Sequence, residues 1–147
     1  MNKQLFRLIN PIVRALLRSP LHGVMSSNTV LLEFKGRKSG RVFVLPVSYF
    51  KQQEQIVCCT DKQNIWWRNL LQVEDIHLVL CGRRRQGRVH IVRDDKAKTL
   101  PLLRDFLIHV PRDASHAGVS LDREGKPVES DLRSRADQFV FLTIDVS

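Results

Sequence analysis

The chain has 147 residues, of which 43% are hydrophobic and 27% are charged, a composition that predicts one globular domain over residues 1–147 and excludes a disordered chain. A domain of this length buries roughly 68–70% of the surface its unfolded chain exposes, so it needs no disulfide or metal for stability. Its 24 Lys and Arg against 15 Asp and Glu give a net charge of +9. That charge favours an anionic partner, whether phosphate, nucleic acid, acidic lipid or a polyanionic cofactor.

The three cysteines predict structural thiols in a reducing compartment. Cys58 and Cys59 are adjacent and follow an apolar pair, which is typical of a buried strand, and Cys81 stands apart. The odd number of cysteines and the lack of a C-x-x-C pair argue against a disulfide framework. The five histidines show no metal-ligand spacing, and no Gly-x-Ser-x-Gly motif is present. We therefore expect neither a metal site nor a hydrolase.

The N-terminal residues 1–20 predict an amphipathic helix. Between residues 3 and 18 the apolar side chains recur every three or four positions and the basic ones share the opposite face, with Pro11 as a kink. Two interpretations remain open: the helix packs on the domain, or it docks on an anionic membrane surface. Because the apolar runs are too short to span a bilayer, we expect a cytoplasmic protein, with peripheral contact at the inner membrane face as the alternative.

The remaining chain, residues 28–146, is predicted to form a small barrel. Six segments rich in β-branched, aromatic and aliphatic residues predict strands: 29–35, 42–50, 56–60, 76–81, 88–92 and 139–146. Helical patterns cover residues 64–71 and 96–110, and residues 111–127 form a polar, turn-rich excursion. Because hairpins connect most strands, the pattern favours a mainly β (α+β) fold with a six-stranded antiparallel barrel.

The turn of the first hairpin is the strongest candidate site. Four cations lie at positions 35, 37, 38 and 41, together with a serine and two glycines. Arginine forks, lysine charges and backbone amides in a glycine turn are donors suited to phosphate oxygens. A solvated basic turn is the alternative interpretation. The second hairpin is predicted to carry an arginine-rich tip at residues 82–87, also solvated, and we expect no nucleic-acid binding because no aromatic residues interleave with these arginines.

The segment Ile65-Trp66-Trp67-Arg68-Asn69-Leu70 is a second candidate. Neighbouring residues on a helix point about 100° apart, so the two tryptophans cannot face one core. One interpretation places one tryptophan in the core and the other, with Asn69, beside a pocket where a flat ring stacks. In the alternative, both tryptophans pack in the core. Asp61 is a candidate cap for this helix.

The stretch SPLHGVMSSNTVLLEFKGRKSGRVFVLPVSYF, followed by IWWRNL and a hairpin, resembles the deazaflavin-dependent nitroreductase and quinone-reductase family. The resemblance covers residues 19–92 and implies the split β-barrel fold of flavin-binding oxidoreductases. It further implies that residues 37–40 bind the phosphate and acidic tail of the deazaflavin F420. Pro46 and Trp66 would lie against its ring.

The chain departs from this family at three places. Phe43 stands where relatives often carry a second arginine, residues 61–64 form a short loop, and Tyr49 is the single tyrosine of the chain. FMN is the alternative cofactor. Its single phosphate needs fewer cations than the phosphate and acidic tail of F420, which fits the missing arginine. A non-enzymatic module that binds a hydrophobic ligand or a polyanion on the same fold is the other hypothesis.

The leading hypothesis from the sequence is an oxidoreductase that transfers hydride from reduced F420 to a quinone-like or nitroaromatic acceptor. Ser48 and Tyr49 are catalytic candidates, and alternation along a strand allows at most one of them to face the pocket. The family also implies a homodimer. The predicted cofactor-binding residues are Arg37, Lys38, Ser39, Gly40, Arg41, Pro46, Val47, Thr60, Trp66 and Asn69.

Overall fold

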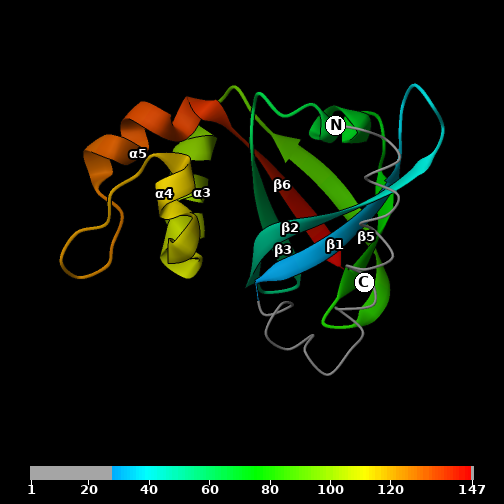
Figure 1. Cartoon of the computed structure of the whole chain (residues 1–147), viewed down its shortest axis with the longest axis horizontal. Helices are drawn as coiled ribbons and strands as arrows, with labels where there is room; N and C mark the ends of the chain where they lie inside the picture. The colour runs from blue at the N-terminus through cyan, green and yellow to red at the C-terminus, as the bar shows by residue number, and fades with distance from the viewer. Residues whose placement is uncertain (1–27, 147) are drawn as a thin grey trace.

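The computed structural model describes residues 28–146, so the predicted N-terminal helix lies outside the described residues. Within them, six antiparallel strands form a closed barrel in the order β1-β2-β3-β6-β5-β4 (Figure 1). The mainly β, six-stranded antiparallel barrel is confirmed. The strands are β1 (Thr29–Lys35), β2 (Val42–Gln52), β3 (Gln55–Asp61), β4 (Asp75–Leu80), β5 (Arg83–Val92) and β6 (Phe139–Val146).

Alternation along each strand divides its side chains between the barrel interior and the outer face. On β1, Val30, Leu32 and Phe34 point inward and join one core cluster with Tyr49 and Ile144. The intervening residues of β2, β3 and β6 point outward. The strands therefore bury apolar residues on both faces, which explains why several of them are continuous apolar runs in the sequence.

The turn between β4 and β5 corrects one expectation. The arginine-rich tip predicted at residues 82–87 is wrong, because Leu80 pairs directly with Arg83 and the loop consists of Cys81 and Gly82 alone. Both loop residues have positive φ, 51° and 81°, as a type I′ hairpin requires. This turn follows the right-handed twist of the strands, so the arginines extend β5 instead of forming a loop.

A helical segment connects β5 to β6 and covers one side of the barrel (Figure 1). Its longest helix, α3 (Lys96–His109), matches the predicted helix and packs Leu103 and Phe106 against Phe50 and Phe141 on the outer barrel face. Its shorter elements follow in chain order: η2 (Pro111–Asp113), α4 (Ala114–Ala117), α5 (Glu129–Arg135) and η3 (Ala136–Gln138).

Helix α5 was not predicted from the sequence. One buried residue, Leu132, anchors it, so the segment offers almost no apolar periodicity. Its charges follow the helix dipole instead, with Glu129 and Asp131 in the first turn and Arg133 and Arg135 in the last. The Arg104 guanidinium bonds to Glu129 and lowers the pKa of this carboxyl, which links α5 to α3.

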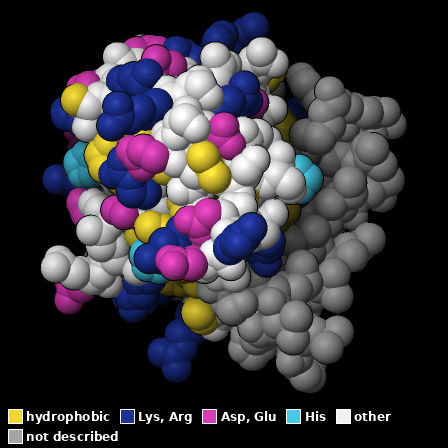
Figure 2. Space-filling model, turned by 90° about the vertical axis from the view of Figure 1, so that its left-hand side faces the viewer, with side chains coloured by type: hydrophobic (Ala, Val, Ile, Leu, Met, Phe, Trp, Pro, Cys, Tyr) yellow, Lys and Arg dark blue, Asp and Glu magenta, His cyan; other side chains and the backbone are white. Residues whose placement is uncertain are grey.

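Positive charge is not concentrated on the helical side of the molecule. Figure 2 shows basic and acidic side chains interspersed over this face. Among the described residues, no helix is long and apolar enough to cross a membrane.

We predict that Gly87→Ala destabilises the barrel. A Cβ on Gly87 would lie 2.5 Å from Ile144 Cγ2 and 3.2 Å from the backbone oxygen of Asp145, so β5 and β6 would have to move apart. We expect a loss of about 1–3 kcal/mol in the free energy of unfolding, measured by urea denaturation. Arg88→Ala, on the exposed face of the same strand, is the control. Equal midpoints for the two variants would contradict this account.

We also predict that one cysteine reacts rapidly in the folded protein. Cys58 is buried and Cys81 is exposed, and burial raises the pKa of the Cys58 and Cys59 thiols. Because the thiolate is the reactive form, the two thiols of β3 should resist alkylation at pH 8. Mass spectrometry should show one fast label on Cys81, and labelling of all three thiols in denaturant. Fast native labelling of Cys58 would refute the burial argument.

Candidate functional site

The loop between β1 and β2 places three cations at an exposed tip. Its backbone closes through hydrogen bonds from Gly36 N to Arg41 O (2.8 Å) and from Gly40 N to Gly36 O (2.9 Å). Gly40 has φ of 68°, which favours glycine. The side chains of Arg37, Lys38 and Arg41 are exposed. The loop is thus a fixed turn whose cations are available to an anion.

Asn69 connects this loop to the tryptophan segment. Its Oδ1 accepts hydrogen bonds from Arg37 N (2.9 Å) and Arg37 Nη1 (3.1 Å), and its Nδ2 donates to Trp66 O (2.9 Å). The sequence separation of 32 residues gave no signal of this contact. Asn69 therefore orients the loop from within the structure, instead of standing as a free wall of a ring pocket.

The tryptophan segment forms a short 3-10 helix, η1 (Trp66–Leu70), with three residues per turn. Trp67 and Leu70 face the core, whereas Trp66 is half-buried and stacks on Phe34 with ring centroids 6.1 Å apart. The two tryptophans differ in burial, as one interpretation expected, but Trp66 also packs against the core cluster; the ring pocket beside Trp66 and Asn69 stays a prediction. Asp61 does not cap this helix, because its Oδ1 accepts the Gln63 amide hydrogen in the preceding turn.

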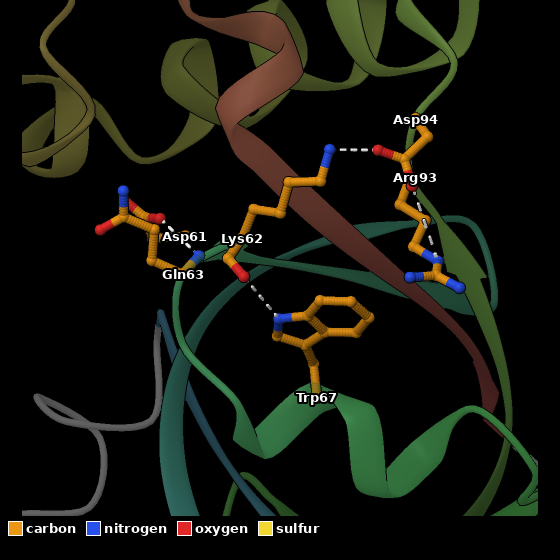
Figure 3. Close-up of polar contacts among 6 residues, drawn as sticks. All are labelled: Asp61, Lys62, Gln63, Trp67, Arg93 and Asp94. Carbon is orange, nitrogen blue, oxygen red and sulfur yellow. Dashed lines mark hydrogen bonds and ion pairs between the residues drawn. The ribbon is translucent and has the colours of Figure 1, made fainter.

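Trp67 is fixed by polar contacts around its ring (Figure 3). Its indole Nε1 donates to Lys62 O at 3.3 Å, and the Arg93 guanidinium carbon lies 5.1 Å from the ring centroid. Asp94 forms ion pairs with Lys62 and Arg93, and the Lys62 ammonium lowers the pKa of this carboxyl. These contacts hold η1 to the connection between β5 and α3.

The predicted ring-binding residues of β2 lie on opposite faces of that strand. Val47 packs against the barrel core, while the exposed Pro46 is on the outer face. Trp66 packs with the core cluster, so it shares a side of β2 with Val47 and not with Pro46. The structure brings together the predicted residues Arg37, Trp66 and Asn69, and it does not place Pro46 beside Trp66.

The two catalytic candidates also separate, as alternation requires. Ser48 is half-buried on the outer face, with its Oγ 3.4 Å from Arg112 Nη2. Tyr49 is buried in the barrel, with its hydroxyl 3.9 Å from Cys81 Sγ. Burial and then the nearby Cys81 raise the pKa of Tyr49, so the phenol stays protonated at neutral pH. Ser48 and Tyr49 lie six and seven residues along β2 from Val42. Both are therefore about 20 Å or more from the end of the hairpin.

Thr60 occupies a different place from the hairpin residues. It is buried near the end of β3 and its Oγ1 accepts a hydrogen bond from Asn64 Nδ2 at 3.1 Å. It lines a cavity of about 290 Å³ between β3 and the helical segment, together with Phe106 and His116.

A larger cleft opens at the base of the β1–β2 hairpin, and sequence reasoning missed it. Its volume is about 410 Å³. The alternation of side chains along β1 predicts which of them point outward. It does not predict where β1 and β4 separate, and the cleft lies at that separation. The lining residues are Glu33, Phe34, Lys35, Val42, Val73, Asp75, Ile76, His77 and Arg84.

Comparison by sequence finds a partial relative. The chain is 30% identical over 77 aligned positions to a Mycobacterium tuberculosis protein named "Putative F420H(2)-dependent quinone reductase", and the match covers 49% of this chain and 65% of that relative. The chain matches no family model. The resemblance to deazaflavin-dependent reductases identified from residues 19–92 is confirmed by this relative.

Comparison by structure finds the same barrel in flavin-related proteins. A pyridoxamine 5′-phosphate oxidase-related, FMN-binding protein of Nostoc punctiforme superposes with a TM-score of 0.54 at 16% identity, covering 93% of this chain and 78% of that one. A structure described as an F420 reductase gives a TM-score of 0.52 at 11% identity, covering 88% and 94%. The chain is therefore a split β-barrel protein, with the fold of these FMN-binding and F420 reductase structures.

Proposed function

We propose that the protein is an oxidoreductase that binds the deazaflavin F420 and transfers hydride to a quinone-like or nitroaromatic acceptor. The partial relative carries a name of this kind, and the barrel is the fold of flavin-related proteins. The single observation that carries the proposal is the β1–β2 loop, a fixed turn that presents cations on a barrel of this fold.

The donors of the loop fit a phosphate and an acidic tail. Three cationic side chains are exposed, and within the described residues no hydrogen bond engages the backbone amides of Lys38 and Ser39. Exposed amides next to cations form an anion-binding concavity. The Ser39 hydroxyl accepts the Arg41 amide hydrogen at 3.3 Å, which leaves its own O–H as a further donor.

In this proposal the protein binds and orients, and the cofactor carries the redox chemistry. Reduced F420 supplies a hydride when it is bound. Arg37, Lys38 and Arg41 neutralise the anionic tail, and Asn69 holds the Arg37 backbone and guanidinium in place for that contact. The Phe34 ring, on β1, stacks on Trp66, and this contact together with the Asn69 hydrogen bonds positions the loop backbone, so less of the loop has to be ordered when the ligand binds.

FMN is the second candidate cofactor. Phe43, at the position where relatives often carry an arginine, is half-buried and packs against Phe34 with centroids 6.1 Å apart. The site therefore has no cation at position 43. The missing contact should reduce the affinity for a ligand with one phosphate less than the affinity for a ligand with a longer acidic tail. Homodimer formation and membrane contact through residues 3–18 stay predictions, and the latter segment lies outside the described residues.

We predict that the purified protein binds F420 more tightly than FMN and that the hairpin carries this affinity. Arg37→Ala/Lys38→Ala should weaken F420 binding at least about tenfold, because two charge-assisted contacts are lost. Fluorescence titration measures both affinities, and oxidation of the reduced cofactor by menadione measures hydride transfer. Arg123→Ala/Lys126→Ala removes the same charge from a distant loop and should not change the affinity.

The titration separates the hypotheses. A preference for FMN would replace the cofactor and keep the reductase. Failure of the protein to bind either cofactor would refute the oxidoreductase, and salt-sensitive binding of polyanions would then favour the binding module.

We predict that Asn69→Ala weakens F420 binding roughly fivefold while lowering the free energy of unfolding by about 1 kcal/mol. The loss of Oδ1 frees the Arg37 backbone and guanidinium, so the loop must be ordered on binding. Gln72→Ala, an exposed amide just after η1, is the matched control. Titration and urea denaturation are measured on both variants, and unchanged affinity in Asn69→Ala would show that the contact is structural alone.

A further inference from the structure

The outer face of the barrel carries an apolar cluster on β1, β2 and β4, which we call the outer cluster. It consists of Leu31, Val44 and Val79, whose side chains are 0%, 4% and 8% exposed. Val30 and Leu32 point into the barrel, so alternation directs Leu31 outward between them. Leu31 pairs with Val79 across β1 and β4, and the cluster therefore follows one seam of the barrel wall.

The helical segment does not supply the cover of this cluster. Among residues 28–146, its core cluster takes strand residues from β2, β3, β5 and β6 and none from β1 or β4, and α3, α4 and α5 gather on one side of the barrel (Figure 1). An outward apolar side chain meets water unless another part of the molecule covers it. The complete burial of Leu31 therefore calls for an apolar cover that the described helices do not provide.

The outer cluster adjoins the cleft at the base of the β1–β2 hairpin. The β1–β4 ladder that joins Leu31 to Val79 ends two residues further along β1, at Glu33. Glu33 also lines the cleft of about 410 Å³. The apolar residues that line this cleft are Phe34, Val42, Val73 and Ile76. An apolar strip of this kind receives the apolar side of an amphipathic helix.

The chain itself carries a segment of that kind at residues 3–18. The apolar side chains there recur every three or four positions, so a helix aligns them in one stripe. A helix over these positions is about 24 Å long. Strand β1, with seven residues, is about 23 Å long. The stripe therefore has the length of the seam that it would cover.

The connection from this segment to the barrel is short. Residues 19–27 join it to Asn28, which directly precedes β1 and whose carbonyl oxygen accepts the Tyr49 amide hydrogen at 3.0 Å. Nine residues extend to at most about 30 Å, which is enough for the segment to return along β1. A tether of this length gives an effective concentration on the order of millimolar, which a second copy in dilute solution does not reach.

We propose that residues 3–18 dock with their apolar stripe on the outer cluster and the adjoining cleft of the same chain. Of the two interpretations that the sequence leaves open for this segment, docking on the domain covers Leu31, whereas docking on a membrane leaves the outer cluster without a cover. The inference goes beyond the proposed function and does not depend on a cofactor. Its test therefore uses the full chain alone.

Photo-cross-linking tests the contact without assuming its register. A p-benzoylphenylalanine in place of Ile9 should form cross-links within one chain, and mass spectrometry should map them to residues 29–35, 42–46 or 75–80. The same group in place of Arg7, on the basic side of the segment, is the matched control and should give at least tenfold fewer of these cross-links. Cross-links between two chains, or cross-links confined to other parts of the barrel, would overturn the proposal.

A lipid arm separates the membrane interpretation. The intramolecular cross-links from position 9 should persist when phosphatidylglycerol vesicles are added. Loss of these cross-links, with transfer of the label to lipid, would assign the segment to the membrane and refute docking on the barrel.

Thiol accessibility tests whether the segment is the cover. In Val79→Cys, the new thiol should react with iodoacetamide at least tenfold more slowly than the exposed Cys81. Adding Ile9→Asp/Ile12→Asp, which places charges in the apolar stripe, should speed this reaction at least tenfold. A fast reaction in the intact chain, or a slow reaction that the two aspartates leave unchanged, would each contradict the docking.

Two controls keep this test independent of unfolding. Arg7→Gln/Arg14→Gln changes the basic side of the segment and should leave the reaction at position 79 as slow as before. Cys58 lies in the barrel interior and is fully buried, so its thiol should stay unlabelled in every folded variant. Rates at position 79 are compared only among variants in which Cys58 is protected.

Discussion

The structure depends on the closure of a six-stranded sheet in which β2, β3 and β6 bury side chains on both faces. Inward residues such as Leu32 and Ile144 fill the barrel, and outward residues such as Phe50 and Phe141 receive the helical segment. Because side chains alternate along a strand, β2, β3 and β6 each take part in both cores. A one-residue shift in register would expose both sets, so the register is strongly specified.

Closure also creates the surface that carries the candidate site. Where the β1–β4 ladder ends, the barrel wall opens into a cleft beside the cationic hairpin. The short helix η1 contacts the hairpin, because its Asn69 accepts a hydrogen bond from the Arg37 backbone. The predicted binding residues thus lie on a strand turn and a short helix that hydrogen-bond to each other, an arrangement that lowers the entropy cost of ligand binding.

The elements were predictable where a local pattern existed. The strand at Thr29–Lys35 and the last strand at Phe139–Val146 have the predicted bounds, because β-branched and aromatic runs are local signals. The position of Arg83 and helix α5 were not predicted. The position of Arg83 depends on a two-residue turn with positive φ, and α5 is held by the packing of Leu132. Neither feature produces a strong local pattern in the sequence.

By itself, the sequence determined the barrel class and the basic hairpin, because composition and turn chemistry are local properties, and it left two interpretations open for Trp66 and Trp67. Only the tertiary structure decided which of these residues meet. It joined Arg37 to Asn69 across 32 positions, and it separated Pro46 from Trp66. Such contacts depend on how the strands close into a barrel, and closure is a property of the whole sheet that no single segment encodes.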